Sequence, residues 1–123
     1  MCFLDYGIIT LLYQDSIGGL EIRGPSGSWI DATPIPGAVL INAGDMLEIF
    51  TNGKIPAAMH RVVIPELEIK RKTSRQSIVF FVNADDDTPI APLPNFEHCG
   101  LRKQYHPVSA LDYVHGRSAV NFT

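Results

Sequence analysis

The chain has 123 residues, of which 46% are hydrophobic, and carries 10 Lys and Arg against 13 Asp and Glu. This length predicts one globular domain. The net charge of −3 argues against a nucleic-acid or anionic-membrane partner, since both require a basic surface. No apolar run reaches the roughly 20 residues of a membrane span. Two cysteines without metal-type spacing, Cys2 and Cys99, favour a reducing compartment and predict a cytoplasmic protein.

The first half of the chain reads as short strands separated by Gly- and Pro-containing turns. Residues 8–13 form a β-branched run of strand length, and residues 20–23 alternate apolar and charged side chains like a half-buried strand. Two more short apolar runs follow, at residues 28–31 and 38–41. Strands at this spacing predict an antiparallel sandwich or barrel, an all-β fold.

The second half of the chain is predicted to contain further short strands, followed by an irregular tail. Residues 46–50 predict another short strand, and the following Asn52-Gly53 is a hairpin signal. Further strands are expected at residues 60–64 and 77–82, with a charged loop between them. Beyond Pro89 we expect an irregular tail, with one short helical turn at residues 109–114.

Two pairs of residues could carry chemistry. Asp5 precedes the first strand and His60 opens a later one, so both could meet at a barrel mouth and bind a divalent metal. The alternative for His60 is an ordinary half-buried histidine. Arg75 and Ser77 stand two residues apart on one strand face and could hold an organic carboxylate. The alternative for Arg75 is a solvated side chain at a loop end.

Several motifs resemble one family over roughly residues 4–94. The run LDYGIITLLYQD at residues 4–15 is followed in order by GGLE at 18–21, PIPG at 34–37, NAGDML at 42–47 and TNGK at 51–54. His60-Arg61-Val62 and Arg75-Gln76-Ser77 complete the series. In order and spacing, the chain resembles the iron(II)/2-oxoglutarate-dependent oxygenases of the isopenicillin N synthase-like branch.

The resemblance implies a fold, two cofactors and a set of site residues. The fold would be a double-stranded β-helix (jelly roll) over residues 1–94, with a C-terminal extension over 95–123. Asp5 and His60 would bind Fe(II), while Arg75 and Ser77 would bind the cosubstrate 2-oxoglutarate. The activity would be dioxygenase oxidation of a small organic substrate, with release of succinate and CO2.

Two departures from the family pattern support a second reading. The first iron-binding His of the family's His-x-Asp pair would stand at position 3, which is Phe3, and a phenyl ring donates no lone pair. The family's N-terminal portion is also absent before this motif, so the jelly roll is expected to be incomplete, with a second chain covering exposed sheet edges. The alternative function is therefore a truncated, non-catalytic relic of the family.

Overall fold

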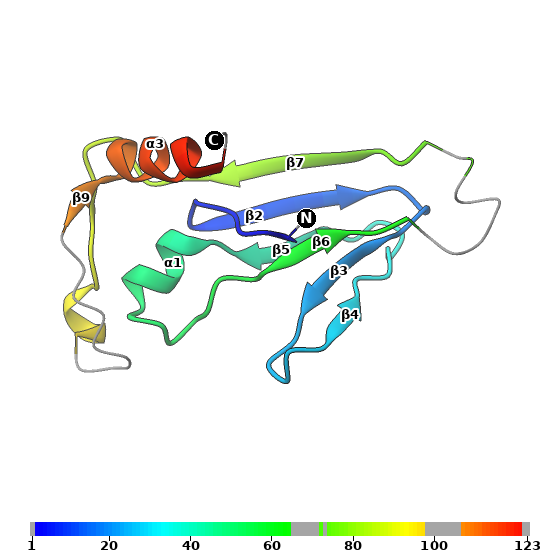
Figure 1. Ribbon diagram of the computed structural model, residues 1–123, viewed down its shortest axis with the longest axis horizontal. Helices are drawn as coiled ribbons and strands as arrows, with labels where there is room; N and C mark the ends of the chain where they lie inside the picture. Colours follow the sequence, from blue (N-terminus) through cyan, green and yellow to red (C-terminus); the bar gives the residue numbers. More distant parts are fainter. Residues whose placement is uncertain (1, 65–71, 73, 98–106, 122–123) are drawn as a thin grey trace.

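The computed structural model describes residues 2–64, 72, 74–97 and 107–121, in which two antiparallel sheets form the body of the molecule (Figure 1). The four-stranded sheet has the order β1-β6-β3-β4, and the three-stranded sheet the order β5-β2-β7. The strands of the first are β1 (Cys2–Phe3), β6 (His60–Val62), β3 (Leu20–Arg23) and β4 (Trp29–Asp31). Those of the second are β5 (Leu40–Ala43), β2 (Ile9–Gln14) and β7 (Ser77–Val82).

The three-stranded sheet follows the two-residue period of its sequence. In β2, the side chains of Thr10 and Leu12 are buried, and the intervening residues point to the opposite face. The register pairs Leu12 with Leu40 on one side and with Val79 on the other, so the inward residues of three strands lie together. The all-β antiparallel architecture expected from the sequence is therefore confirmed, and short helical segments accompany it in the described part of the chain.

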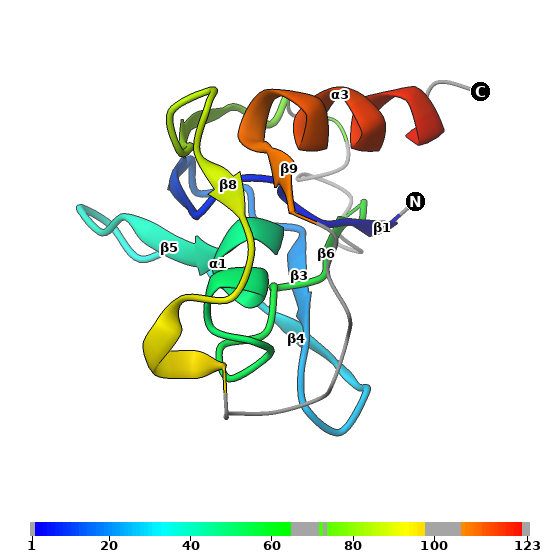
Figure 2. The same cartoon turned by 90° about the vertical axis from the view of Figure 1, so that its left-hand side faces the viewer.

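The main buried cluster lies at one end of the sheets, while Leu12 and Leu20 are buried between them. Met46, at 0% exposure, packs with Ile49 from α1 (Asp45–Phe50), with Ile90 and with Ala110. Ile90 belongs to β8 (Pro89–Ile90), which pairs with β9 (Val108–Ser109), and Ala110 begins α3 (Ala110–Asn121). A short 3-10 helix, η1 (Pro94–Phe96), completes this end (Figure 2). The space between the two sheets contains a cavity.

The strand expected at residues 46–50 is wrong, because this segment is helix α1. Met46 and Ile49 are three residues apart and therefore lie on one helical face, which enters the core. The hairpin expected at Asn52-Gly53 is also wrong: both residues have positive φ, 49° and 80°, and they end the helix. The Gly53 N–H donates to the Glu48 carbonyl (2.8 Å) and the Asn52 N–H to the Ile49 carbonyl (2.9 Å), as at many helix C-termini.

The irregular tail expected beyond Pro89 is also wrong. In place of the one helical turn expected at residues 109–114, α3 continues for twelve residues, and β9 pairs with β8 before it. The charged loop expected between residues 64 and 77 falls largely outside the described residues, and Cys99 lies outside them. The boundary predicted at residue 94 stays a prediction.

None of the helices in the described part of the chain is long and apolar enough to cross a membrane.

Candidate metal and carboxylate site

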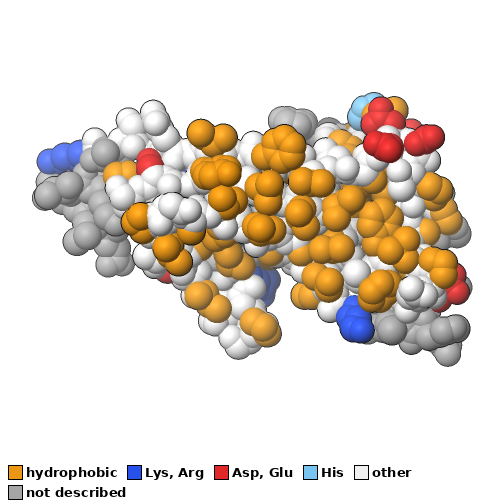
Figure 3. Space-filling view, turned by 180° about the vertical axis from the view of Figure 1, so that it is seen from behind, with side chains coloured by type: hydrophobic (Ala, Val, Ile, Leu, Met, Phe, Trp, Pro, Cys, Tyr) orange, Lys and Arg blue, Asp and Glu red, His pale blue; other side chains and the backbone are white. Residues whose placement is uncertain are grey.

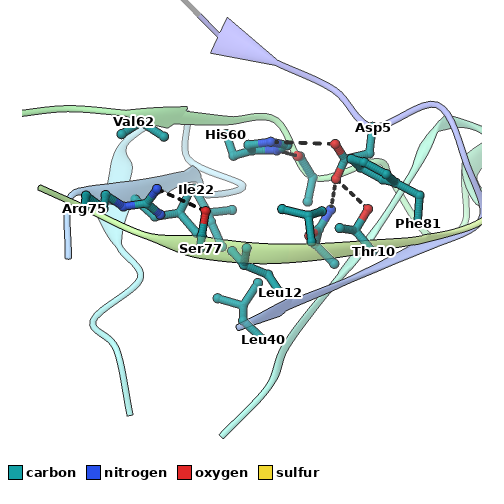
Figure 4. Close-up of a pocket in the computed structure, with 14 residues that line it drawn as sticks. Asp5, Thr10, Leu12, Ile22, Leu40, His60, Val62, Arg75, Ser77 and Phe81 are labelled. Atoms are coloured by element: carbon teal, nitrogen blue, oxygen red, sulfur yellow. Dashed lines mark hydrogen bonds and ion pairs between the residues drawn. The ribbon is translucent and has the colours of Figure 1, made fainter. Parts of the chain in front are cut away.

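All four predicted site residues line one cavity of about 160 Å³ between the two sheets. Asp5 and His60 lie at one end of it, and Arg75 and Ser77 lie at the other (Figure 4). The walls between them are apolar and come from both sheets, with Leu12, Leu20, Ile22, Leu40, Val62 and Val79 among the lining residues. The cavity thus joins a carboxylate–imidazole pair to a guanidinium–hydroxyl pair along apolar side chains.

Asp5 and His60 face each other at one end of the cavity. The His60 Nε2 atom lies 3.8 Å from Asp5 Oδ1, and both side chains are largely shielded from solvent. His60 stands at the start of β6, and Asp5 lies in the loop between β1 and β2. One cation can contact both atoms at this separation, because metal–ligand distances to imidazole nitrogen and carboxylate oxygen are about 2.0–2.2 Å.

The carboxylate of Asp5 is oriented by two donors on the inner face of the three-stranded sheet. Thr10 Oγ1 donates to Asp5 Oδ2 at 2.7 Å, and Asn42 Nδ2 donates to the same oxygen at 2.8 Å. Thr10 comes from β2 and Asn42 from the paired position of β5. Because both donors engage Oδ2, the Oδ1 atom is left to face His60. Hydrogen bonds of this kind fix the direction of a metal-binding carboxylate.

The imidazole of His60 is fixed in the same manner. Its Nδ1 atom lies 2.9 Å from the Ala58 carbonyl oxygen. A carbonyl can only accept, so Nδ1 carries the proton of the neutral ring and the lone pair is on Nε2, which faces Asp5. The two groups therefore present one oxygen and one nitrogen donor to a common point, which is a donor set that suits Fe(II).

Phe3 occupies the strand position opposite His60. The β1–β6 register pairs these two residues, and their ring centroids are 6.2 Å apart. Cys2 pairs with Arg61 and is exposed, so its sulfur gives no evident replacement for a third ligand. No group of three or more His, Cys, Asp or Glu side chains able to hold a metal occurs within the described residues. Within the described residues, the candidate metal site therefore offers two protein donors, Asp5 and His60.

Arg75 and Ser77 meet at the other end of the cavity, although β7 begins at Ser77 and Arg75 precedes it. Arg75 Nη1 donates to Ser77 Oγ at 3.4 Å. Two further hydrogen bonds orient the guanidinium of Arg75: its Nε donates to the Gly18 carbonyl (3.1 Å) and its Nη2 to Gln14 Oε1 (3.4 Å). A guanidinium held in this orientation beside a hydroxyl can receive a carboxylate by charge-assisted hydrogen bonds.

The loop that carries Asp5 is fastened to the first turn of α1. The Asp45 N–H donates to the Asp5 carbonyl (2.8 Å), and the Met46 N–H donates to the Gly7 carbonyl (3.1 Å). A Cβ at Gly44 would lie 2.3 Å from the Gly7 oxygen, so only glycine allows this approach. These contacts set the position of Asp5 independently of any ligand.

The side chain of Asp45 in turn connects this loop to α3. Asp45 Oδ2 forms a 2.6 Å ion pair with Arg117 and accepts a 3.2 Å hydrogen bond from Tyr113. Arg117 also lies over the ring of Tyr6, 5.3 Å from its centroid. Burial raises the pKa of Asp45, and the nearby Arg117 charge opposes that shift.

Sequence reasoning missed the residues that orient the two candidate ligands. Thr10 and Asn42 lie in segments that carry the family resemblance, but no role was predicted for them or for Ala58. A signal existed for Thr10, because it is a polar side chain in a run of apolar residues and faces inward with Leu12. Buried hydroxyls require a hydrogen-bond partner, and an inward Thr therefore marks a polar site in a barrel.

Comparisons with proteins of known sequence or structure identify the family of the chain. A sequence profile of the 2OG-Fe(II) oxygenase superfamily matches residues 2–84. The chain is 42% identical over 123 residues to the UPF0676 protein C1494.01 of Schizosaccharomyces pombe, which covers 97% of this chain and 36% of that protein. It is 36% identical over 113 residues to the 2-oxoglutarate-Fe(II) type oxidoreductase hxnY of Emericella nidulans, which covers 91% of this chain and 31% of that protein.

The fold is similar to that of solved structures in the same group. The crystal structure of a full-length Neurospora crassa protein in complex with alpha-KG and thymine superposes with a TM-score of 0.83 at 36% identity, covering 98% of this chain and 37% of that one. The chain thus spans about a third of the length of the curated relatives that it matches. The resemblance seen in the sequence motifs is confirmed: the chain belongs to the 2OG-Fe(II) oxygenase superfamily, whose cofactors are Fe(II) and 2-oxoglutarate.

Proposed function

We propose that this chain is the iron- and 2-oxoglutarate-binding part of a dioxygenase that oxidises a small organic substrate, with release of succinate and CO2. The observation that carries the proposal is the single cavity shared by Asp5, His60, Arg75 and Ser77. Its two polar ends match the two cofactors of the family. A jelly roll over residues 1–94, an extension over 95–123 and a cytoplasmic location remain part of the proposal.

Each group has a distinct task in this assignment. Asp5 Oδ1 and His60 Nε2 bind Fe(II), while Thr10 and Asn42 keep the Asp5 carboxylate turned toward the metal. Arg75, with the Ser77 hydroxyl beside it, binds the carboxylate of 2-oxoglutarate that lies farther from the metal. When bound, the two cofactors supply the oxidation: one oxygen atom of O2 enters succinate, the other enters the substrate, and 2-oxoglutarate loses CO2.

The second candidate is a non-catalytic relic that retains binding alone. Phe3 favours it, because the site then offers two protein ligands instead of three, and metal affinity depends on ligand number and geometry. Under this reading the cavity would still bind a metal ion and a keto acid. The two candidates therefore differ in turnover and share the same binding residues.

One assay separates the two candidates. The purified chain is loaded anaerobically with Fe(II) and 2-oxoglutarate, and succinate is measured after oxygen is admitted. Oxygen-dependent succinate from the chain, lost in Asp5→Ala and retained in Asp31→Ala on the exposed surface of β4, supports the dioxygenase. Metal and 2-oxoglutarate binding without succinate supports the relic. Failure of Asp5→Ala to weaken metal binding would contradict both.

We also propose that a second copy of the chain covers the open edge of the three-stranded sheet. Among the described strands, β7 pairs only with β2, so its other edge is free. Its residues 77–82 include no charge and no proline, and Ile78 and Phe80 are 71% and 62% exposed on the outer face. Figure 3 shows hydrophobic side chains spread across the middle of this side of the molecule.

Antiparallel pairing of β7 with β7 of a second copy would place the same residues opposite each other, as a two-fold interface requires. Light scattering after size-exclusion chromatography should then give a dimer for the chain. Phe80→Lys should convert it to a monomer, whereas Leu93→Lys, an exposed position away from the sheet, should not. A monomeric wild-type chain would refute this proposal.

A further inference from the structure

The turn that follows β2 contacts the segment that carries Arg75. Asp15 comes directly after β2, and Gln76 stands between Arg75 and the start of β7. The Asp15 N–H donates to the Gln76 carbonyl at 3.2 Å, which continues the β2–β7 pairing one residue beyond the Gln14–Ser77 pair. The backbone next to Arg75 is therefore bound to the chain that follows β2, although neither Asp15 nor Gln76 belongs to a strand.

The Asp15 carboxylate accepts two backbone hydrogen bonds. Its Oδ2 atom accepts from the Gln76 N–H at 2.5 Å, and its Oδ1 atom accepts from the Ile17 N–H at 3.0 Å. The second bond closes an Asx turn, in which an aspartate side chain takes the role of a backbone carbonyl. The hydrogen bonds from Gln76 and Ile17 lower the pKa of the Asp15 carboxyl, so the group is ionised at neutral pH. One side chain thus joins the turn after β2 to the segment that carries Arg75.

The same turn supplies an acceptor for the Arg75 side chain. The carbonyl of Gly18, one residue after Ile17, accepts the hydrogen bond from Arg75 Nε at 3.1 Å. Gly18 is buried and has a φ of 79°, in the left-handed region that favours glycine. The direction of its carbonyl therefore depends on the conformation of the turn, which the hydrogen bond between Ile17 and Asp15 stabilises.

Asp15 thus acts on both ends of the Arg75 side chain. Through Oδ2 it holds the backbone next to the Arg75 Cα atom, and through Oδ1 it holds the turn whose carbonyl receives the guanidinium Nε. Arg75 Nη1 remains directed to Ser77 in the cavity (Figure 4). A long side chain that is already held in its binding orientation loses less conformational entropy when a ligand arrives, so it binds that ligand more tightly.

We propose that Asp15 is a positioning residue of the carboxylate clamp: its two hydrogen bonds hold Arg75 in the orientation that receives the ligand and thereby raise the affinity for 2-oxoglutarate. Asp15 is not among the described residues that line the cavity, so it acts through Arg75 and not by touching the ligand. The inference rests on the proposed function, because that function makes a carboxylate of 2-oxoglutarate the partner of Arg75. Cosubstrate binding then depends on a residue outside the cavity.

Calorimetric titration of the full chain, loaded with Zn(II), with 2-oxoglutarate measures the effect. Asp15→Ala should weaken binding about tenfold, the effect of losing one charge-assisted hydrogen bond to the ligand. Asp31→Ala is the matched control, because Asp31 also accepts a hydrogen bond from two residues along the chain, from Thr33, but on the exposed surface. Zn(II) affinity reports on the opposite end of the cavity and should stay the same in both variants. Unchanged 2-oxoglutarate affinity in Asp15→Ala, or an equal loss of Zn(II) affinity, would overturn the inference.

Two further variants separate positioning from charge. Asp15→Asn removes the negative charge near Arg75 and retains one oxygen acceptor, so a positioning role predicts weaker 2-oxoglutarate binding. Tighter binding would show instead that the Asp15 charge only competes with the ligand. In an Arg75→Lys background the Gly18 carbonyl has no Nε to hold, so Asp15→Ala should weaken binding by at most about twofold more. A further loss of about tenfold in that background would show that Asp15 does not act through Arg75.

The orientation of Arg75 can also be followed without any ligand. Its hydrogen bond to Gly18 protects the Arg75 Nε–H from exchange with water, and the signal is assigned in proton–nitrogen NMR spectra by its loss in Arg75→Lys. Asp15→Ala should accelerate this exchange about tenfold, while Asp31→Ala should not. Equal exchange rates in Asp15→Ala and the wild type would refute the positioning role.

These measurements keep the two proposals distinguishable. If Asp15→Ala accelerates exchange at Arg75 while Arg75→Lys leaves 2-oxoglutarate binding unchanged, the proposed function fails and the positioning of Arg75 by Asp15 stands. If Arg75→Lys weakens 2-oxoglutarate binding while Asp15→Ala changes neither the exchange rate nor the affinity, the inference fails and the proposed function stands.

Discussion

Replacing Thr10 with Val removes one hydroxyl from the candidate metal site and almost no volume. Thr10 is 4% exposed, and its Oγ1 donates one of the two hydrogen bonds received by Asp5 Oδ2. Loss of a group that orients a ligand typically lowers metal affinity 10- to 100-fold. Because Asn42 still holds the same oxygen at 2.8 Å, we expect the lower limit, about tenfold or ~1.4 kcal/mol.

Anaerobic calorimetric titration with Fe(II) measures this change. Thr33→Val is the matched control, since Thr33 Oγ1 also donates to an aspartate, Asp31, on the exposed surface. Thr10→Ser keeps the hydroxyl and should retain most of the affinity. The reasoning is refuted if a folded Thr10→Val binds Fe(II) as tightly as the wild type, or if Thr10→Ser loses as much affinity as Thr10→Val.

Three further outcomes are expected. Phe3→His should raise Fe(II) affinity in the same titration, because position 3 faces His60 across the β1–β6 pair; unchanged affinity would show that the ligand geometry is wrong. Arg75→Lys should weaken 2-oxoglutarate binding about tenfold, since Lys cannot form a bidentate pair, whereas Arg23→Lys, on the exposed surface, should not. Burial raises the pKa of the Asp45 carboxyl, so the stability that this group contributes to the fold is full below its ordinary pKa of 3.8 and declines as pH rises through the higher folded-state pKa. Asp45→Asn should abolish this decline in thermal melts recorded between about pH 3 and 6. Melting temperatures of variant and wild type that change in parallel with pH would contradict the prediction.

The strands can be predicted wherever side-chain alternation and burial agree. Residues 9–14 and 77–82 are rich in β-branched and aromatic side chains, which are typical of strands. The sequence of residues 46–50 does not distinguish a strand from a helix, because a run of five mostly apolar residues fits either one equally well. Tertiary contacts decide it: Met46 and Ile49 must reach one core together, and a helix places them on the same face.

The site can be predicted to the extent that spacing along one element determines it. Arg75 stands two residues before Ser77, the first residue of β7, so their contact is local in the sequence. Asp5 and His60 lie on segments far apart in the sequence; their positions at strand ends allow them to meet, and the family resemblance predicts that they do. The donors to Asp5 depend on the β2–β5 register, which pairs Thr10 with Asn42 and which no local pattern specifies.

The position of Asp5 depends on residues from both ends of the chain. Its backbone carbonyl is held by the first turn of α1, and the Asp45 side chain of that turn is held by Tyr113 and Arg117 of α3. Arg117 additionally contacts Tyr6, the residue after Asp5. Because ligand orientation controls metal affinity, α3 influences the site without contributing a metal donor. A tail helix that lies outside the matched residues 2–84 is therefore part of what positions the site.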